Sequence, residues 1–498
     1  MFRTTLFVLG IAFAGAAAGP VETSWPQFRG PGGLGLGDDK TSLPSEFGPS
    51  KAVLWKTTLP LGHGSPCIWG DRVFVTGFDA SSKKLEVIAV SRKDGQIAWR
   101  QTIPAKEVEK VHAVSSPATS TPVTDGERVY VYSGSYGVLA YDLTGKLAWQ
   151  YPMPVATSPY GSGISPALAG DLVVITRDYP PEPYVLSLNK KDGTVAWKVG
   201  LPPSNQRGPR TSHSTPFVWK NQIVLHRPGE IAAYAPSDGK RLWWFPTGSG
   251  GTSSLSGGEA VIYVNGFNMM TDPAGAAQLP PYSYALEKYD ADKDGKLSAA
   301  EAPGNDLYFL RRSGMPESVP GAHFTIKLFF GMVDRNKDGF VDETEYNGIT
   351  PLMKSITAPP GVGLLSLKPE GEGALSSSAL QWAEPRSVPE ISAPLEYRGR
   401  VYMITAGGIL TAVDAKTGKV VYRGRVNAPG AYYASPVAAG GKIFVASAEG
   451  VVSVLGGGDT LEVLANNDLG EPVYGTPAPV GSAIYIRSAE HLWAFGSR

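Results

Sequence analysis

The chain has 498 residues, and its 45 basic and 45 acidic side chains give no formal net charge. This length is greater than that of a domain with one ordinary hydrophobic core, and it indicates several domains or one large repeat array. The even charge argues against a nucleic-acid binder, because such a protein needs a basic excess or a basic stripe. The 60 glycines and 42 prolines, with few long amphipathic helical patterns, favour many short strands joined by turns.

Residues 1–18 are predicted to be a signal peptide. Arg3 supplies a positive charge, a short apolar run comes next, and Ala16–Ala18 forms an A-x-A cleavage site before Gly19. The alternative is an uncleaved anchor helix, but the apolar run is shorter than the roughly 20 residues needed to span a bilayer. The single cysteine, Cys67, lies far from the cleavage site. We therefore expect an exported protein, periplasmic or extracellular, that is not a lipoprotein and has no transmembrane segment.

A unit of four strands recurs along the chain. Each unit begins with a step of a small residue and proline, often Ser-Pro or Thr-Pro, and the steps within each half of the chain lie 41 to 56 residues apart. A glycine-containing turn and a β-branched or aromatic strand come after the step. These second strands number eight and cover residues 72–75, 128–131, 172–175, 222–225, 261–264, 400–403, 442–445 and 483–486. Four strands in about 40–50 residues predict an all-β, eight-bladed β-propeller of four-stranded antiparallel blades.

The outer strands of the first four units carry tryptophan. In each of them Trp lies four residues after the glycine of an Asp/Gly turn: Trp99, Trp149, Trp197 and Trp243. Glycine suits the turn because it takes positive φ without strain, and we expect the indole rings to pack between units. The last unit lacks an outer strand. Residues 53–57 are predicted to supply it, so that the two chain ends close the ring and remove an exposed edge.

Residues 25–31 read Trp-Pro-Gln-Phe-Arg-Gly-Pro. With the repeat, this phrase resembles the pyrroloquinoline-quinone (PQQ) repeat propellers, which include the quinoprotein alcohol dehydrogenases and the propeller lipoprotein of the outer-membrane protein assembly machinery. The likeness is strongest to exported PQQ-like proteins of planctomycete-type bacteria. It implies an N-terminal extension over 19–52, a first propeller part over 53–271 and a second over 361–498. It is specific for fold and says little about function.

The fifth unit is interrupted, and residues 272–360 are predicted to be a small α-helical EF-hand insert in blade 5. Two loops, 290–301 and 334–345, match the EF-hand pattern at every position, with glycine at the sixth. Calcium prefers oxygen ligands, and the loops supply them from side chains and, at Lys296 and Phe340, from the backbone carbonyl. The predicted ligands of two Ca²⁺ ions are Asp290, Asp292, Asp294, Lys296, Glu301, Asp334, Asn336, Asp338, Phe340 and Glu345.

The first loop departs from the EF-hand pattern just after its last ligand. Pro303 and Gly304 come almost at once after Glu301, so the helix that leaves this loop is expected to be a turn or so at most. A short helix predicts a weaker first site. The alternative for both loops is a metal-free remnant of an EF-hand or a coincidental acidic turn.

Polar and aromatic residues stand just before the proline steps. In a propeller these positions gather around one mouth of the channel: His63, Lys110, His112, Tyr160, Arg210, His213, Tyr432, Tyr433 and Tyr474. Such a ring is a candidate site for a small anionic molecule or an extended peptide. The alternative is that these side chains fill the channel and satisfy one another.

The quinoprotein enzymes that the chain resembles hold PQQ in the channel beneath a Cys-Cys disulfide, beside a calcium ion and a catalytic Asp. Cys67 is alone and cannot form such a pair, so PQQ is not the expected cofactor. The sequence favours a non-catalytic scaffold that binds another exported or envelope protein. The competing hypothesis is an enzyme that uses the channel, either a PQQ-dependent dehydrogenase or another small-molecule enzyme.

Overall fold

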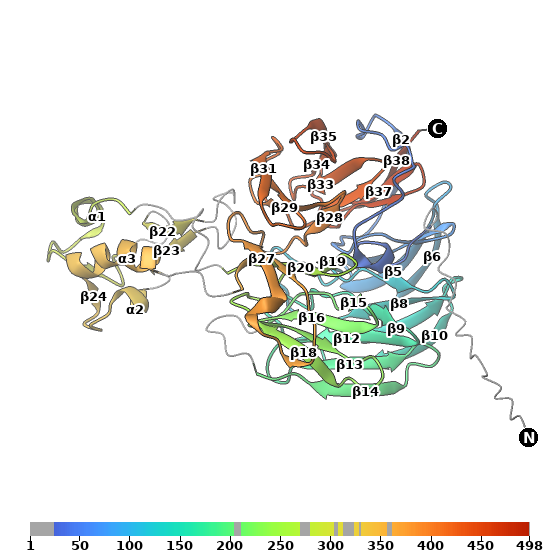
Figure 1. Cartoon of the computed structure of the whole chain (residues 1–498), viewed down its shortest axis with the longest axis horizontal. Coiled ribbons are helices and arrows are strands. Elements are labelled where there is room, and N and C mark those ends of the chain that lie inside the picture. The colour runs from blue at the N-terminus through green and yellow to red at the C-terminus, as the bar shows by residue number, and fades with distance from the viewer. Residues whose placement is uncertain are drawn as a thin grey trace, which may run out of the picture.

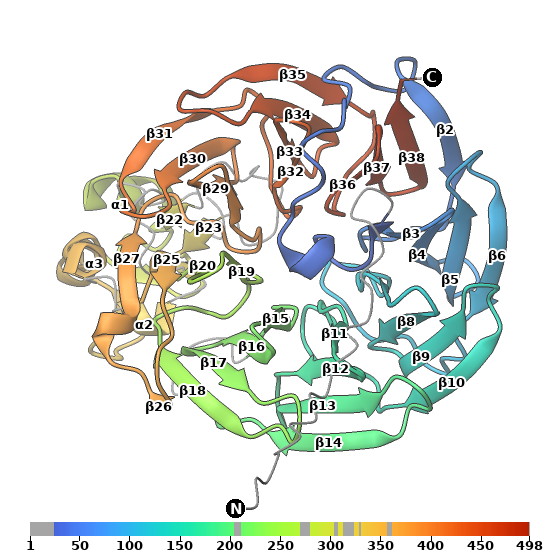
Figure 2. The ribbon, with the colours of Figure 1, turned by 45° about the vertical axis from the view of Figure 1, so that its right-hand side comes forward.

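The structure is a computed structural model that describes residues 24–203, 211–268, 279–302, 307–311, 323–327, 330–355 and 361–497. In this part of the chain, eight sheets of four principal antiparallel strands are arranged around a central axis (Figure 2). The predicted eight-bladed β-propeller is confirmed. The predicted signal peptide, residues 1–18, lies outside the described residues. None of the described helices has both the length and the apolar character needed to cross a bilayer.

Each blade runs from an innermost strand at the channel to an outermost strand at the rim. From the inside outward, the strands of blades 1 to 4 are β3 (Cys67–Trp69), β4 (Arg72–Asp79), β5 (Lys84–Ser91) and β6 (Ile97–Thr102); β7 (Val123–Thr124), β8 (Arg128–Ser133), β9 (Gly137–Asp142) and β10 (Leu147–Pro152); β11 (Ala167–Ala169), β12 (Leu172–Arg177), β13 (Tyr184–Asn189) and β14 (Val195–Gly200); β15 (Phe217–Trp219), β16 (Gln222–Arg227), β17 (Glu230–Tyr234) and β18 (Arg241–Pro246).

Blades 5 to 8 keep the same order. Their strands are β19 (Ser256–Gly257), β20 (Ile262–Gly266), β25 (Gly363–Leu367) and β27 (Leu380–Glu384); β28 (Leu395–Tyr397), β29 (Arg400–Thr405), β30 (Ile409–Asp414) and β31 (Val420–Arg425); β32 (Val437–Ala439), β33 (Lys442–Ala446), β34 (Val451–Gly456) and β35 (Val463–Asp468); β36 (Ala478–Val480), β37 (Ala483–Arg487), β38 (His491–Gly496) and β2 (Val53–Thr58).

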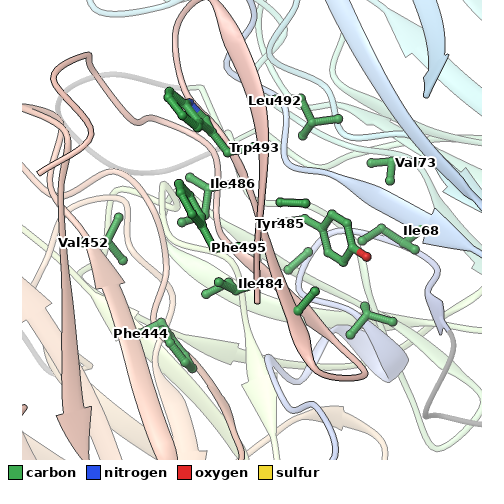
Figure 3. Packing of buried hydrophobic residues seen from close by; sticks show 14 of the residues in the cluster. Ile68, Val73, Phe444, Val452, Ile484, Tyr485, Ile486, Leu492, Trp493 and Phe495 are labelled. Carbon is green, nitrogen blue, oxygen red and sulfur yellow. The ribbon is translucent and has the colours of Figure 1, made fainter. Parts of the chain in front are cut away.

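The ring closes through both ends of the chain. The N-terminal strand β2 pairs antiparallel with β38, with Lys56 opposite Trp493 and Thr57 opposite Leu492, and so completes blade 8 as predicted. The apolar faces of blades 7, 8 and 1 meet in one buried cluster that includes Phe444, Ile484 and Phe495 (Figure 3). Burying these side chains stabilises the closure, because each removes apolar surface from water.

Five outer-strand tryptophans each join their blade to the next. The Nε1–H of Trp149 donates to the carbonyl of Lys190 (2.8 Å) in the following blade, and its ring covers Gly193, where a Cβ would come within 2.5 Å. Gly193 has a φ of 73°, so the turn needs glycine both for its backbone and for the indole. The same contact recurs for Trp55 on Gly95, Trp99 on Gly145, Trp197 on Gly239 and Trp382 on Gly418.

The contact differs where blade 4 meets blade 5. Between β25 and β27 it has no Asp/Gly turn, and the connection instead supplies a short strand, β26 (Gly373–Ala374), which pairs parallel with β18 of blade 4. Trp243 therefore lies opposite Gly373, and its Nε1–H donates to the Gln222 side chain (2.9 Å).

A belt of hydroxyl groups follows the channel at the proline steps and at the matching Ser254-Leu255 step of blade 5. In each link the backbone N–H of one step donates to the Ser or Thr hydroxyl of the next blade's step. The links are Ser65 to Thr121, Thr121 to Ser165, Ser165 to Thr215, Thr215 to Ser254, Ala393 to Ser435, Ser435 to Thr476 and Thr476 to Ser65, at 2.9 to 3.1 Å. The belt is open between blades 5 and 6, because Ala393 has no hydroxyl to offer Ser254.

The N-terminal segment of residues 24–37 lies in the centre of the ring (Figure 2). Its first residues form β1 (Ser24–Trp25), which pairs with β3 of blade 1, and a 3-10 turn lies at Pro31–Gly33. The Pro26 carbonyl accepts from Thr124 N–H of blade 2 (2.8 Å), and Leu36 bridges Ala438 of blade 7. The segment thus contacts blades 1, 2 and 7.

The insert lies beside the propeller (Figure 1) and connects β20 to β25. Its elements are α1 (Tyr282–Tyr289), β21 (Leu297–Ser298), β22 (Tyr308–Arg311), β23 (His323–Thr325), α2 (Phe330–Val333), β24 (Phe340–Val341) and α3 (Glu343–Ser355). We call this part the EF-hand lobe. The predicted limits of the insert, residues 272 and 360, lie outside the described residues and stay a prediction.

Candidate functional site

The second EF-hand loop begins as α2 ends and finishes inside α3. The backbone N–H groups of the loop bond to the predicted ligands: Gly339 N–H donates to Asp334 (3.0 Å), and Arg335 N–H donates to Glu345 (2.8 Å). Gly339 has a φ of 89°, which permits the sharp bend at the sixth position. These bonds aim the carboxylates inward.

The first loop repeats this arrangement bond for bond. Gly295 N–H donates to Asp290 (3.0 Å), and Ala291 N–H donates to Glu301 (2.9 Å). The Ser298 N–H also donates to the Glu301 carboxylate (3.0 Å) and the Glu301 N–H to the Ser298 hydroxyl (3.4 Å), the two bonds of a capping box. After Glu301 the chain forms a turn and no helix within the described residues; Pro303 and Gly304 lie outside them.

A two-strand ladder couples the loops. Leu297 of β21 lies opposite Val341 of β24, and both side chains are fully buried. The Tyr282 hydroxyl donates to the Val341 carbonyl at 2.8 Å and lies 3.1 Å from the Gly295 carbonyl, so α1 is tied to both loops. Around them lies the small core of the lobe, with Ala285, Ile326 and others.

The carboxylates of each loop converge. One oxygen from each of Asp334, Asp338 and Glu345 lies within 4.8 Å of the others, and the same holds for Asp290, Asp292 and Asp294. Such a set of oxygen ligands suits a hard cation such as Ca²⁺.

The loops differ in exposure and in charge environment. Asp334 and Glu345 are buried, at 6% and 7% exposure, whereas Asp292 and Asp294 are exposed. The Asp294 amide lowers the pKa of Asp292, but slight desolvation and the charges of Asp294, Glu301 and Asp290 raise it more, so the net shift is upward. Hydrogen bonds from Ser298 and Ala291 lower the pKa of Glu301 to about 2. The carboxylate that the pattern places at position 12 of this loop is therefore ionised at neutral pH.

Six of the residues predicted at the channel mouth form an arc of aromatic rings. They come from the loops that lead into blades 7, 8, 1, 2, 3 and 4, and we call them the mouth arc: Tyr433, Tyr474, His63, His112, Tyr160 and His213. Ring centroids lie 5.9 Å apart for Tyr433 and Tyr474, 3.9 Å for Tyr474 and His63, 5.2 Å for His112 and Tyr160, and 5.8 Å for Tyr160 and His213.

Three predicted mouth residues stand apart from the arc. Tyr432 packs in the core of blades 6 and 7, and its hydroxyl donates to the Ala428 carbonyl (2.7 Å), because neighbouring residues of an extended segment point to opposite sides. Lys110 is exposed. Arg210 lies outside the described residues.

Glu109 is a mouth residue that the sequence analysis missed. It is 3% exposed and accepts bonds from the backbone N–H (2.8 Å) and hydroxyl (3.0 Å) of Ser162. Burial raises its pKa to about 7, although the Ser162 bonds and Arg177 oppose the rise. Glu109 thereby fixes the loop that carries Tyr160. Its position beside Lys110 in the same loop was the available signal.

Two histidines of the arc, His63 and His213, do not carry a charge at neutral pH. Burial lowers the pKa of His213 to about 4, and burial with the nearby Arg487 does the same for His63. Both rings are neutral at neutral pH. The described arc is therefore an aromatic surface, which suits stacking and apolar contact better than attraction of anions.

The chain shares its sequence pattern with known proteins. The family model described as "Outer membrane protein assembly factor BamB" matches residues 45–179, 181–271 and 373–467, and an EF-hand model matches residues 284–301 and 326–349. The outer membrane protein assembly factor BamB of Yersinia pestis is 23% identical over 422 residues, which span 82% of this chain and 89% of that protein.

Solved structures share the fold. BamB from Moraxella catarrhalis has a TM-score of 0.52 at 13% identity, over 89% of this chain and 99% of that one. A europium-containing methanol dehydrogenase has a TM-score of 0.57 at 12% identity, over 96% and 98%. At sequence identities this low, the similarity to these structures shows a shared fold and nothing about function. Because the BamB family model matches more than half of its residues, the chain belongs to that family of PQQ-like β-propellers, with EF-hand motifs added in blade 5.

Proposed function

We propose that this protein is an exported, non-catalytic interaction scaffold that binds calcium through its EF-hand lobe. The observation that carries the calcium proposal is the convergence of Asp334, Asp338 and Glu345 within 4.8 Å, in a loop whose backbone amides hold them in place. Three like charges so close repel one another, and a divalent cation removes that repulsion.

The second loop is the tighter of the two sites in this proposal. Its Asp334 and Glu345 are buried and Glu345 lies in α3, whereas the first loop is more exposed and ends in a turn. Rigid ligands bind a cation more tightly because less ordering accompanies binding. Extracellular calcium modules work at about 10⁻⁴–10⁻³ M, which sets the concentration range for both sites.

Isothermal calorimetry on the chelated full chain tests the calcium sites. We expect two binding events, and Glu345→Gln should weaken the tighter one by at least the roughly tenfold that loss of a supporting residue costs a metal site. Glu301→Gln should affect only the weaker event. Glu343→Gln, an exposed neighbour outside the ligand set, is the matched control and should leave both events intact. Absence of heat at millimolar calcium would refute the proposal.

The partner in this proposal is another exported or envelope protein that offers an extended, apolar or aromatic segment to the mouth arc. Tyr160 is 44% exposed between His112 and His213, so its ring is available for stacking. Small anions are the less favoured ligand, since His63 and His213 are neutral. Peptide-array binding should be lost in Tyr160→Ala with His213→Ala and kept in Tyr284→Ala, an exposed tyrosine of the lobe. Equal binding by both variants would argue against a site at the mouth.

The signal peptide and the enzyme hypothesis each have a direct test. N-terminal sequencing of the protein recovered from the periplasm or medium should begin at Gly19. Incubation with PQQ and calcium, then an absorbance scan and a dye-reduction assay with alcohols, should give no turnover if the protein is a scaffold. Turnover above the buffer control would favour the competing dehydrogenase.

A further inference from the structure

Arg29 brings a positive charge into the channel without a negative partner. It is 1% exposed, and its guanidinium donates to the carbonyls of Leu255 (3.3 Å), Leu34 (3.2 Å) and Pro394 (2.6 Å). Within the described residues no carboxylate forms an ion pair with it, and its Nε has no hydrogen-bond partner. A guanidinium has five N–H donors, so three are used and two remain.

Arg29 lies at the one open link of the hydroxyl belt described above, between blades 5 and 6. Leu255 and Pro394 come directly after Ser254 and Ala393, the two steps between which the hydroxyl belt is open. Arg29 thus spans the open link by bonding to both blades. Carbonyl dipoles compensate a buried full charge only in part, and buried charges in proteins are as a rule paired. Burial lowers the pKa of Arg29 to about 9, which leaves it charged at neutral pH.

A cavity of about 20 Å³ lies against Arg29. Among its lining residues are Gln27 of the N-terminal segment and the belt residues Thr215 and Ser254. Each belt hydroxyl accepts a backbone N–H, from Ser165 and Thr215 respectively, and retains its own proton to donate. The cavity therefore combines a positive charge with hydrogen-bond donors.

We propose that this cavity binds one halide ion, chloride in the natural setting, as the counter-ion of Arg29. A site for one water needs roughly 10–15 Å³, so about 20 Å³ suits a single atom-sized ligand. Gln27, Phe28 and Thr215 are only partly buried, which gives the ion a route from solvent. The bound halide holds the N-terminal segment in the channel by neutralising the residue that anchors it. This site does not depend on the EF-hand lobe.

Thermal unfolding of the full chain, at fixed calcium and fixed ionic strength, tests the halide site. Replacing sodium gluconate by sodium chloride or bromide should raise the Tm of the propeller in a saturable way, because a ligand that binds only the folded state stabilises it. Arg29→Met, which keeps the length of the side chain, should remove this dependence. Arg72→Met, at an exposed arginine, should keep it. Identical Tm values in halide and gluconate would overturn the proposal.

A second measurement needs no variant. Crystals of the wild-type protein grown in sodium bromide should show an anomalous peak in the cavity beside Arg29. Water alone at this position, with no anomalous signal, would also overturn the proposal.

Discussion

The propeller and the EF-hand lobe are stabilised in different ways. Neighbouring blades are joined by contacts complete within the chain, such as Trp149 on Gly193 and the hydroxyl belt. The lobe has a small core around Ala285, Leu297 and Val341 and two loops whose carboxylates crowd together. None of these contacts between blades involves a cation, whereas the lobe carries unbalanced negative charge. Calcium should therefore matter for the lobe and not for the blades.

The largest expected effect concerns a buried ion pair between blades 3 and 4. Arg227 Nε lies 2.8 Å from Asp178, and both residues are at most 5% exposed. Asp178→Ala should lower the free energy of unfolding of the propeller by about 3 kcal/mol, because it removes the more buried of the two carboxylates that pair with Arg227 and leaves only Glu230 (2.6 Å). Chemical unfolding measures this, with Asp71→Ala in the exposed pair with Arg72 as control. If calcium restored the stability lost in Asp178→Ala, the propeller would depend on calcium as well, and the distinction between the two regions would fail.

Glu109 predicts a pH dependence of the propeller. Its pKa is about 7 in the folded chain and near 4.5 when unfolded. Stability is therefore unaffected by this group below about pH 4.5, falls as pH rises towards 7, and stays reduced above that, by up to about 3 kcal/mol.

Glu109→Gln should remove this fall. The free energy of unfolding of the variant should therefore rise relative to that of the wild type between pH 5 and pH 8. His63 and His213 act in the opposite sense, since their lowered pKa values cost stability as pH falls below about 6.5, but they are common to both proteins and cancel in the difference. Glu107→Gln, an exposed neighbour, is the control. A difference between variant and wild type that does not change with pH would show that Glu109 is not buried in this way.

A glycine pair separates packing between blades from backbone strain. Gly193 and Gly170 both have positive φ, at 73° and 60°, but only at Gly193 would a Cβ meet a tryptophan; at Gly170 nothing lies within 4 Å. Gly170→Ala should cost about 1 kcal/mol through strain, and Gly193→Ala about 1–3 kcal/mol more through overlap with Trp149. Thermal unfolding measures both. Equal losses would mean that the indole contact contributes little.

The smallest expected effect is at the open link of the belt. Ala393→Ser supplies the missing hydroxyl and should stabilise the propeller by about 1 kcal/mol, the usual net value of one hydrogen bond. Ser435→Ala, which removes the acceptor of Ala393 N–H, should cost a similar amount. Denaturant midpoints of the two variants should move in opposite directions. A loss in both would show that the link tolerates no side chain larger than alanine.

The repeat pattern was sufficient to predict the eight blades, the closing role of residues 53–57 and the tryptophans at the rim. The spacing of ligands in the two loops was sufficient to predict the EF-hand motifs. These features depend on short-range spacing. The belt, the β26 pairing with β18 and the place of Arg29 depend on which residues of distant segments come together, and spacing does not encode that. Tyr432 and Tyr433 illustrate the same limit, since neighbours in one loop point to a core and to the mouth.

Scanning calorimetry of the full chain in calcium and in chelator tests the contrast between the two regions most directly. We predict that millimolar calcium moves the unfolding transition of the lobe to higher temperature and leaves that of the propeller in place. A calcium-insensitive scan would contradict the account, and so would a scan in which both transitions move together.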